Sequence, residues 1–543
     1  MKRRDFIKRT VPVSVLPIFL GGLTLRAYGR SPILEALVSS GTETDHVLVL
    51  IQLNGGNDGL NMVIPLDQYS ALTSARPNIV IDENKVLQLS TATGLHPSMT
   101  ELQSLYHQGK LTVVQGVSYP NPNLSHFRAT DIWLTASDSN ATLTTGWLGR
   151  YLDQEYPDFP NGYPNTVMPD PLAIQIGSVV SNVLQGQNGS MGMAITSPTS
   201  FYQLVSGGVD TAPNTPAGHE LTFIRQVAQQ TQQYATVIQS AASTGNNVST
   251  LYPAPNSNSL ADQLKIVAQL ISGGLKTRMY VVNLGGFDTH SNQVSATTGT
   301  ETGTHANLLN KLSVAINAFQ DDLTLMGLQD RVIGMTFSEF GRRIASNASI
   351  GTDHGTAAPL FVFGGKIAPG IVGTNPTIPQ NVTSNDNLPM QYDFRSVYAS
   401  ILKDWFGVSS EILSAVLLKD FQLLPIIYVP HRDPKPDPLQ PPPNDETVKA
   451  SNNELYPNEI GIRQNYPNPF NPTTTIPFSS NGGLIQIKVY DSIGKEVRTL
   501  ADGIYSAGEH HIIFDASDLP AGTYYYRMRS DGYQEVKPMV LVK

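Results

Sequence analysis

The sequence contains no cysteine, and this absence excludes several kinds of site at once. Disulfide bonds, cysteine-ligated iron–sulfur clusters and thiolate zinc sites all need cysteine sulfur. Any metal site in this chain must therefore use histidine, aspartate, glutamate or other oxygen ligands. Histidine is itself scarce, with 11 among 543 residues, so a histidine that lies near a carboxylate is informative.

The chain also lacks an excess of basic residues. Its formal net charge is -9, whereas a nucleic-acid binder needs a basic face that displaces counterions. We therefore expect no nucleic-acid partner. A length of 543 residues exceeds what one hydrophobic core usually serves, so we expect two or more domains. The 45 glycines and 38 prolines predict many turns and long loops.

The first 30 residues have the pattern of a signal peptide. Charged residues at 2–8 are followed by a short apolar stretch at 11–25 and by small residues within 27–29. Prolines and glycines interrupt the apolar stretch, which is too short for a stable membrane span. The pair Arg3-Arg4 resembles the twin-arginine signal, and this resemblance implies the twin-arginine translocase as a partner. The alternatives are an ordinary secretory signal or a membrane anchor.

The other end of the chain has the pattern of a linker followed by a small β domain. Residues 431–460 are rich in proline with almost no apolar periodicity, which predicts an extended, semi-rigid linker. Residues 461–543 alternate short strand-like segments with turn signals, which predicts a small Ig-like antiparallel β-sandwich. The predicted strands are 473–478, 484–490, 510–514, 523–527 and 535–542, and the turn signals lie at 492–494, 506–508 and 520–522.

Three motifs in this end domain carry a resemblance. They are Tyr466-Pro467-Asn468-Pro469-Phe470-Asn471-Pro472, Val489-Tyr490-Asp491-Ser492-Ile493-Gly494 and Leu519-Pro520-Ala521-Gly522-Thr523-Tyr524. Together they resemble the C-terminal sorting domain of type IX secretion substrates. The resemblance implies the type IX secretion machinery as a partner, and a protein that crosses the periplasm to the cell surface or the outside. The alternative is a generic sandwich appended for adhesion.

The middle of the chain alternates apolar runs with amphipathic stretches, which predicts a layered α/β domain. The expected strands are 47–53, 111–117, 279–284, 332–337 and 360–363, and the expected helices are 260–271 and 307–326. We expect the first strand and the last three to lie in one mostly parallel sheet. In such a sheet the carboxyl ends of the strands form the ligand crevice.

Polar loops beside four of these strands hold the candidate chemistry. The residues are Asp58, Asp288, His290, Glu339, Asp353 and His354. If the loops converge at one sheet edge, this set of carboxylates and imidazoles suits zinc, manganese or magnesium. Taken one by one, each residue also fits ordinary turn chemistry or a structural hydrogen bond.

Two histidines are expected to matter most for this metal site. Asp288 and His290 are two residues apart, and in an extended segment such residues point to the same side. His354 supplies a second imidazole from the loop before the last apolar run. His305 is a reserve ligand from the start of the following helix, whereas we do not expect His96 or His107 to bind metal.

Six blocks of this region resemble one family. They are Gly55-Gly56-Asn57-Asp58-Gly59-Leu60-Asn61, Ser125-His126-Phe127, Thr145-Gly146-Trp147-Leu148-Gly149-Arg150, Phe287-Asp288-Thr289-His290, Ser338-Glu339-Phe340-Gly341-Arg342 and Asp353-His354-Gly355. Across residues 44–427 the chain is similar to the family catalogued as domain of unknown function 1501, which resembles the alkaline phosphatase and sulfatase superfamily. The resemblance implies a three-layer α/β domain with a mostly parallel central sheet. It also implies divalent metal, often two ions, at the strand ends, and attack on phosphate or sulfate esters by a Ser, Thr or modified residue.

The resemblance assigns roles to residues of this chain. Asp58 would match the first-strand ligand, Asp288 and His290 the Asp…His pair, and His354 the late histidine ligand. Glu339 follows Ser338 where the superfamily has an Asp-His pair, which removes one nitrogen ligand. Asp288 and His290 also lie closer together than is usual. A single metal ion or a degenerate binding site is the alternative that these departures leave open.

The predicted catalytic set is Ser125, Glu339 and Arg342. No nucleophile follows the first strand within a turn, and Ser125, in the polar loop after strand 111–117, is the best candidate. Arg128, Arg342 or Arg343 would hold an anionic substrate. We therefore predict an exported metal-dependent hydrolase that acts on a small phosphate or sulfate ester. The alternative is a non-catalytic cell-surface binding or scaffolding protein, which scattered site residues would favour.

Overall fold

The protein is described here from a computed structural model. The structure describes residues 45–198, 234–429 and, with gaps at 463–464, 466–469, 492–494 and 531–532, residues 461–542. It also describes two short antiparallel strands, β1 (Phe19–Leu20) and β2 (Leu23–Thr24). Apart from these strands, the predicted signal peptide (1–30) and linker (431–460) lie outside the described residues. The chain divides into two compact units, Met1–Pro438 and Leu439–Lys543.

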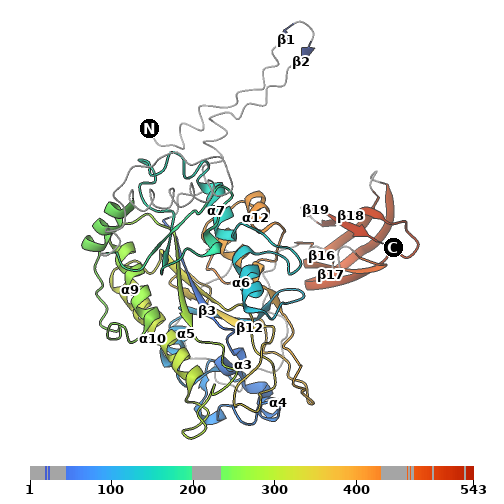
Figure 1. The fold of residues 1–543 in the computed structure, drawn as a ribbon. Coiled ribbons are helices and arrows are strands. Elements are labelled where there is room, and N and C mark those ends of the chain that lie inside the picture. Colours follow the sequence, from blue (N-terminus) through green and yellow to red (C-terminus); the bar gives the residue numbers. More distant parts are fainter. Residues whose placement is uncertain are drawn as a thin grey trace. The chain divides into compact units, whose positions relative to one another are not determined.

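A nine-stranded sheet forms the centre of the first unit (Figure 1). Its order is β13 (Gly370–Val372), β7 (Leu111–Ser118), β12 (Ala358–Gly364), β11 (Val332–Phe337), β3 (Val47–Asn54), β10 (Met279–Gly285), β8 (Ala173–Ile176) and β9 (Met193–Ile195), and β14 (Tyr392–Asp393) pairs with β7. The four strands predicted to share a sheet, β3, β10, β11 and β12, do so. Only β12, among the described strands of this sheet, runs antiparallel to its neighbours, β11 and β7. The prediction of a mostly parallel sheet is confirmed.

Helices cover both faces of this sheet (Figure 1). They are α5 (Thr100–His107), α9 (Ser259–Ser272) and α10 (Thr304–Leu325) on one face, and α6 (His126–Thr135), α7 (Trp147–Glu155), α11 (Phe394–Ser400) and α12 (Ser410–Leu417) on the other. Val49 and Ile51 of β3 belong to the first buried cluster and Leu50 to the second. Successive strand residues point to opposite faces, so an unbroken apolar strand requires cover on both. The predicted three-layer α/β class and the helices at 260–271 and 307–326 are confirmed.

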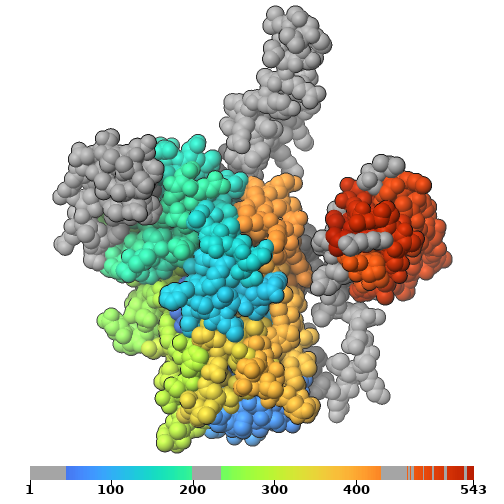
Figure 2. All heavy atoms as spheres, turned by 45° about the vertical axis from the view of Figure 1, so that its right-hand side comes forward, coloured from blue at the N-terminus to red at the C-terminus, as the bar shows by residue number. Residues whose placement is uncertain are grey.

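Short elements build the loops around the sheet. They are α3 (Gly59–Met62), β4 (Val63–Pro65), η1 (Leu66–Gln68), α4 (Tyr69–Ala75), η2 (Glu83–Lys85), β5 (Leu87–Gln88), β6 (Thr93–Leu95), η3 (Asn182–Leu184) and the π-helical turn η5 (Ile401–Trp405). Strands β4, β6 and β5 form a separate antiparallel sheet. The segment that contains α6, blue to cyan in Figure 2, lies at the surface of the unit. No helix in the described part of the chain has the length and apolarity that a membrane crossing requires.

The second unit is antiparallel throughout its described strands, as predicted for an Ig-like sandwich. Its strands are β15 (Gly461–Ile462), β16 (Thr473–Tyr490), β17 (Glu496–Asp515), β18 (Gly522–Ser530) and β19 (Tyr533–Leu541). The predicted strands 473–478 and 484–490 are one strand, β16, and the turn predicted at 506–508 lies inside β17. The prediction of a turn there was wrong because the ladder continues through the small residues, with Ser480 paired to Gly508 and Asn481 to Ala507.

Candidate metal centre

The sheet brings four loops to one edge, after β3, β7 and β10 and between β11 and β12. Strands β3, β10 and β11 are parallel, and β7 runs in the same direction because β12 is antiparallel to both β11 and β7. The carboxyl ends of these four strands and the amino end of β12 therefore lie at the same edge. This edge carries the loop after β10, with Asp288 and His290, and the loop before β12, with Asp353 and His354. The loop after β7 leads to His126, the first residue of α6.

Three imidazoles converge on one carboxylate. The Nε2 atoms of His290 and His354 lie 3.1 and 3.2 Å from Asp288 Oδ1. His126 Nε2 lies 3.5 Å from Asp288 Oδ2. His126, Asp288 and His354 offer ligand atoms that all lie within 4.8 Å of one another. The side chains therefore form one compact group drawn from three separate loops.

Each imidazole makes a hydrogen bond through its Nδ1 atom, on the side of the ring away from Asp288. His126 Nδ1 lies 2.8 Å from Glu339 Oε1, His354 Nδ1 lies 2.8 Å from the carbonyl oxygen of Leu124, and His290 Nδ1 lies 3.0 Å from Asp353 Oδ1. Carboxylate and carbonyl oxygens only accept hydrogen bonds, so each Nδ1 is the donor. Such outer partners fix the tautomer and orientation of histidines that bind metals.

This tautomer leaves a lone pair on each of the three Nε2 atoms, which lie within 3.5 Å of the Asp288 carboxylate. Without a positive charge between them, the Nε2 atoms of His290 and His354, 2.9 Å apart, would repel each other and Asp288. A shared proton or a cation removes this repulsion. Imidazole nitrogens with one carboxylate are a ligand set that suits zinc and other divalent transition ions. The donor set therefore fits the divalent metal that the sequence predicts.

The charges in this group are those that metal binding needs. Burial raises the pKa of Asp288, but its neighbours, with the hydrogen bond from Arg342 first among them, outweigh burial and lower that pKa to about 2. Burial lowers the pKa of His354, which favours its neutral form. The hydrogen bond from His290 lowers the pKa of Asp353. Carboxylate ligands must be ionised and imidazole ligands neutral before they can bind a metal.

Arg342 ties the loops together rather than facing the solvent. Its buried guanidinium donates to Gly56 O (2.6 Å), to Thr352 O (2.8 Å) and to Asp288 Oδ1 (2.7 Å), and also to the carbonyl oxygens of Gly55 and Phe287. Gly55 itself has φ +122°, and a Cβ there would lie 2.3 Å from the backbone nitrogen of Asp288. A side chain at Gly55 would therefore push the two loops apart.

Residues 338–357 form one excursion that leaves the sheet after β11 and returns at β12. Its neck is closed by an isolated bridge between Arg342 and His354, and by a 2.8 Å hydrogen bond from Gly355 N to Gly341 O. A Cβ on Gly355 would lie 2.2 Å from the carbonyl carbon of Arg342, so glycine is required there. The excursion supplies both Glu339 and His354 to the site.

Asp58 lies in a separate buried ion pair. Its Oδ2 atom is 2.8 Å from Arg76 Nη1 and accepts from Gln293 Nε2 at 2.6 Å, while Oδ1 accepts from Leu60 N at the start of α3. Burial raises the pKa of Asp58, but the positive charge of Arg76 outweighs it and the pKa stays lowered. The reserve ligand His305 is also buried nearby, with its Nε2 2.9 Å from Asn57 Oδ1. Of the five predicted ligands, the structure brings together Asp288, His290, Glu339 and His354, but not Asp58.

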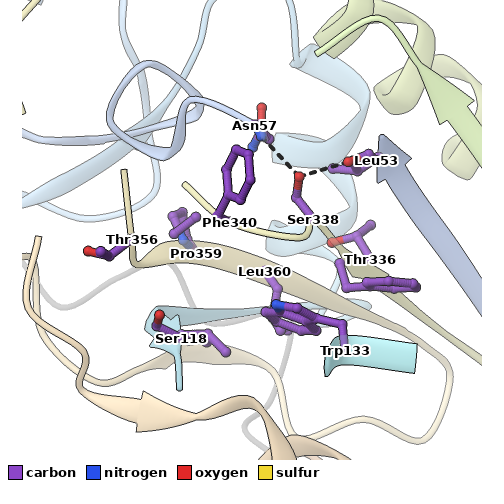
Figure 3. Close-up of a pocket in the computed structure, with 13 residues that line it drawn as sticks. Leu53, Asn57, Ser118, Trp133, Thr336, Ser338, Phe340, Thr356, Pro359 and Leu360 are labelled. Carbon is purple, nitrogen blue, oxygen red and sulfur yellow. Dashed lines mark hydrogen bonds between the residues drawn. The ribbon is translucent and has the colours of Figure 1, made fainter. Parts of the chain in front are cut away.

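Glu339 and Ser338 connect the metal-site loop of His126 to the loop after β3 through hydrogen bonds. Glu339 Oε1 accepts from Gly55 N at 2.9 Å as well as from His126, and Oε2 lies 3.2 Å from the Ser338 hydroxyl. That hydroxyl accepts from Asn57 N and lies 2.7 Å from Leu53 O (Figure 3). The void beside Ser338 measures about 10 Å³, which is room for about one water molecule. It is too small for a substrate.

A larger open cleft of about 530 Å³ lies beside His126 and Asp288. Ser125, the predicted nucleophile, is exposed just before α6 and is not among the residues that line this cleft. The arginines predicted to hold an anion are committed elsewhere: Arg342 as above, Arg128 to Asp131 and three carbonyl oxygens, and Arg343 to the carbonyl oxygens of His354 and Asn385. Each of the three predicted arginines therefore already donates hydrogen bonds to other groups of the protein.

His126 is the site residue that sequence reasoning missed. The signal was present, because His126 follows Ser125 in the polar loop after the correctly predicted strand β7. In that loop Ser125 is the predicted nucleophile, and the pattern of the sequence assigns no role to the imidazole of His126 beside it. A histidine after a strand whose carboxyl end shares the crevice is a candidate ligand on the same grounds as His290.

Two buried histidines behind the site predict a loss of stability in acid. Burial lowers the pKa of His96 to about 3 and the pKa of His305 to about 4. An unfolded histidine titrates near 6.5, so below that pH the unfolded chain takes up protons that the folded chain refuses. The free energy of unfolding should therefore have its full value above pH 6.5. It should fall by roughly 2 kcal/mol per histidine between pH 6.5 and pH 5.

Urea unfolding of metal-free protein at pH 7.5, 6.0 and 5.0 measures this loss. His96→Phe should make the free energy of unfolding less dependent on pH, whereas His107→Ala, which changes an exposed histidine, should leave the dependence as it is. A free energy of unfolding that stays constant from pH 7.5 to 5.0 would show that these two histidines are not buried in the neutral form.

Comparisons with known proteins place the chain by its sequence. The model of a family described as protein of unknown function DUF1501 matches residues 45–417, and the model of a secretion system C-terminal sorting domain matches residues 464–543. No curated protein matches the chain.

Solved structures are similar only at low identity. A protein in the alkaline phosphatase superfamily from Vibrio parahaemolyticus is 9% identical over 92% of this chain and 83% of that chain, with a TM-score of 0.33. A protein from a study of glycosaminoglycan metabolism in Bacteroides thetaiotaomicron is 10% identical over 87% and 90%, with a TM-score of 0.32. PorZ, a surface component of the type IX secretion system of Porphyromonas gingivalis, is 17% identical over 16% of this chain and only 11% of its own length, with a TM-score of 0.12.

Proposed function

We propose that this chain, which belongs to the DUF1501 family of proteins of unknown function, is an exported metal-dependent hydrolase of phosphate or sulfate esters. The observation that carries the proposal is the convergence of three imidazole Nε2 atoms on Asp288, each imidazole held through Nδ1 by an oxygen acceptor. In a structural histidine, one ring nitrogen usually donates a hydrogen bond and the other accepts one. Here the Nε2 atoms of His290 and His354 both carry lone pairs and lie 2.9 Å apart.

The proposed ligands are His126, Asp288, His290 and His354. A divalent ion there would polarise an ester oxygen and make a bound water more acidic. Glu339 and Asp353 keep the proton on Nδ1 of His126 and His290, so that Nε2 faces the site. Arg342 holds Asp288 in place and keeps it ionised. These residues therefore position the ligands rather than attack the substrate.

The negative charge of the cleft makes the binding of an anionic substrate dependent on the metal. Asp288 and Glu339 line the cleft, and Arg128, Arg342 and Arg343 already donate to other groups. A phosphate or sulfate ester would meet carboxylates of like charge unless a cation lay between them. Removal of the metal should therefore abolish substrate binding as well as turnover.

The sorting domain at 464–543 supports export to the cell surface or the outside. In this proposal the type IX secretion machinery recognises that domain after the twin-arginine translocase has carried the chain into the periplasm. The twin-arginine route suits a metal site, because it carries folded proteins.

Metal analysis with an ester screen tests the proposal. Purified, dialysed protein should contain zinc, manganese or magnesium near one or two equivalents, and should hydrolyse an aryl phosphate or an aryl sulfate. Treatment with a chelator should lower hydrolysis by at least about a hundredfold, and added metal should restore it. Protein that binds none of these ions, and gains no thermal stability from them, would leave the alternative of a non-catalytic surface protein.

A further inference from the structure

One face of α6 forms a wall of the cleft. Phe127, Thr130, Asp131 and Leu134 line the cleft, and their spacing of three, four and seven residues places them on the same side of the helix. This wall begins next to His126, whose imidazole reaches the metal centre. A substrate whose ester group lies at the centre would therefore extend the rest of its structure along α6.

Phe127 is the most exposed large apolar side chain among the described residues, with 92% of its surface accessible. An aromatic ring in water gains free energy when a ligand covers it, and exposed aromatics at cleft rims mark binding sites. Because Phe127 makes no contribution to the core, packing does not explain a large apolar residue at this position.

Polar side chains that line the same cleft are available to a ligand. Asn54 at the end of β3, Thr130 of α6 and Asn182 at the start of η3 all line the cleft. In the described part of the chain none of their side-chain groups takes part in a hydrogen bond. Asp131 is paired with Arg128, so its charge is offset. The cleft therefore offers one aromatic face, two amides and one hydroxyl, beside the charged centre.

We propose that this wall is a subsite for a sugar ring, and that the substrates are phosphate or sulfate esters of carbohydrates. A pyranose has an apolar C–H face that stacks on an aromatic ring, while its hydroxyls bind amide and hydroxyl groups at the edge. A cleft of about 530 Å³ matches the size of a small-molecule site. This inference rests on the proposed ester chemistry at the metal centre and names the alcohol that the ester carries.

Calorimetric binding to the metal-loaded protein tests the subsite without requiring turnover. The probes are methyl phosphate, phenyl phosphate, a hexose phosphate and the matching sulfates. The hexose ester should bind about tenfold more tightly than the methyl ester. Phe127→Ala should remove that advantage and leave the affinity for the methyl ester and the metal content unchanged. Leu325→Ala, which truncates an exposed apolar residue on α10, is the matched control and should change none of these values.

The outcomes separate the subsite from the ester chemistry. Hexose esters that bind through Phe127 but are not cleaved would keep the subsite and overturn the hydrolase. Hydrolysis of all esters alike, unaffected by Phe127→Ala, would keep the hydrolase and overturn the subsite. Phenyl phosphate that binds at least as well as the hexose ester would overturn the assignment to sugars, as would a hexose ester that does not bind.

Discussion

Replacement of His290 or His354 by alanine should abolish stoichiometric metal binding and, with it, ester hydrolysis. Each variant removes an Nε2 atom that lies within 3.2 Å of Asp288, and with it one of the four proposed ligands. His126→Ala should have the same effect, since its Nε2 approaches the other side of the carboxylate. Atomic absorption of dialysed protein gives the metal content, and thermal unfolding shows whether each variant is folded.

Variants of the residues that hold the ligands test whether the loss of metal is specific to this centre. Glu339→Gln and Asp353→Asn keep the ligands but weaken the hold on Nδ1, so metal affinity should fall by about 10- to 100-fold rather than vanish. His107→Ala removes an exposed histidine at the end of α5 and should leave the metal content unchanged. Equal metal content in wild type and in the His290, His354 and His126 variants would contradict the assignment of all three ligands.

Arg76→Met should destabilise the metal-free protein by about 3–5 kcal/mol. The substitution leaves the carboxylate of Asp58 buried without its counter-charge, 2.8 Å from where Arg76 Nη1 lay. It also removes the guanidinium hydrogen bonds to Asn61 and to the carbonyl oxygens of Arg343 and Ile344. Urea unfolding in the presence of a chelator measures the change directly.

Two further variants show what Asp58 does. Arg331→Met breaks the exposed pair with Asp45 and should cost less than about 1 kcal/mol. Asp58→Asn should lower the free energy of unfolding and leave the metal content unchanged, because Asp58 is paired with Arg76 outside the group around Asp288. Loss of metal in Asp58→Asn without loss of stability would instead support the ligand role that the family resemblance implies.

The sheet could be predicted from sequence because its strands are unusually clear. The run from Val47 to Leu53 has to be covered on both faces, and only a central strand of a layered domain provides that. Helices α9 and α10 follow from apolar residues at three- and four-residue spacing, and their observed ends lie close to those predicted. The convergence of Asp288, His290 and His354 followed from the same rule, since strand ends share an edge.

Other features could not be predicted because they depend on distant partners. The turn chemistry around Asp58 is the same whether the carboxylate meets a metal or the guanidinium of Arg76, and only the fold decides. Arg342 resembled an anion clamp, but its partners are carbonyl oxygens of three loops far apart in sequence. In the second unit, glycine and serine at 506–508 suggested a turn, while the pairing with β16 carried the strand through.

The reversed direction of β12 has a consequence for how this protein family can change. Because β12 enters the sheet at the crevice, the excursion at 338–357 begins and ends at the same place. It carries Glu339, Asp353 and His354 but contributes no strand to the sheet. Shortening this one segment would remove Glu339, Asp353 and His354 and leave every strand of the sheet in place. The proposed chemistry and the sheet can therefore change separately, because three of the residues around the metal centre come from a segment that no strand depends on.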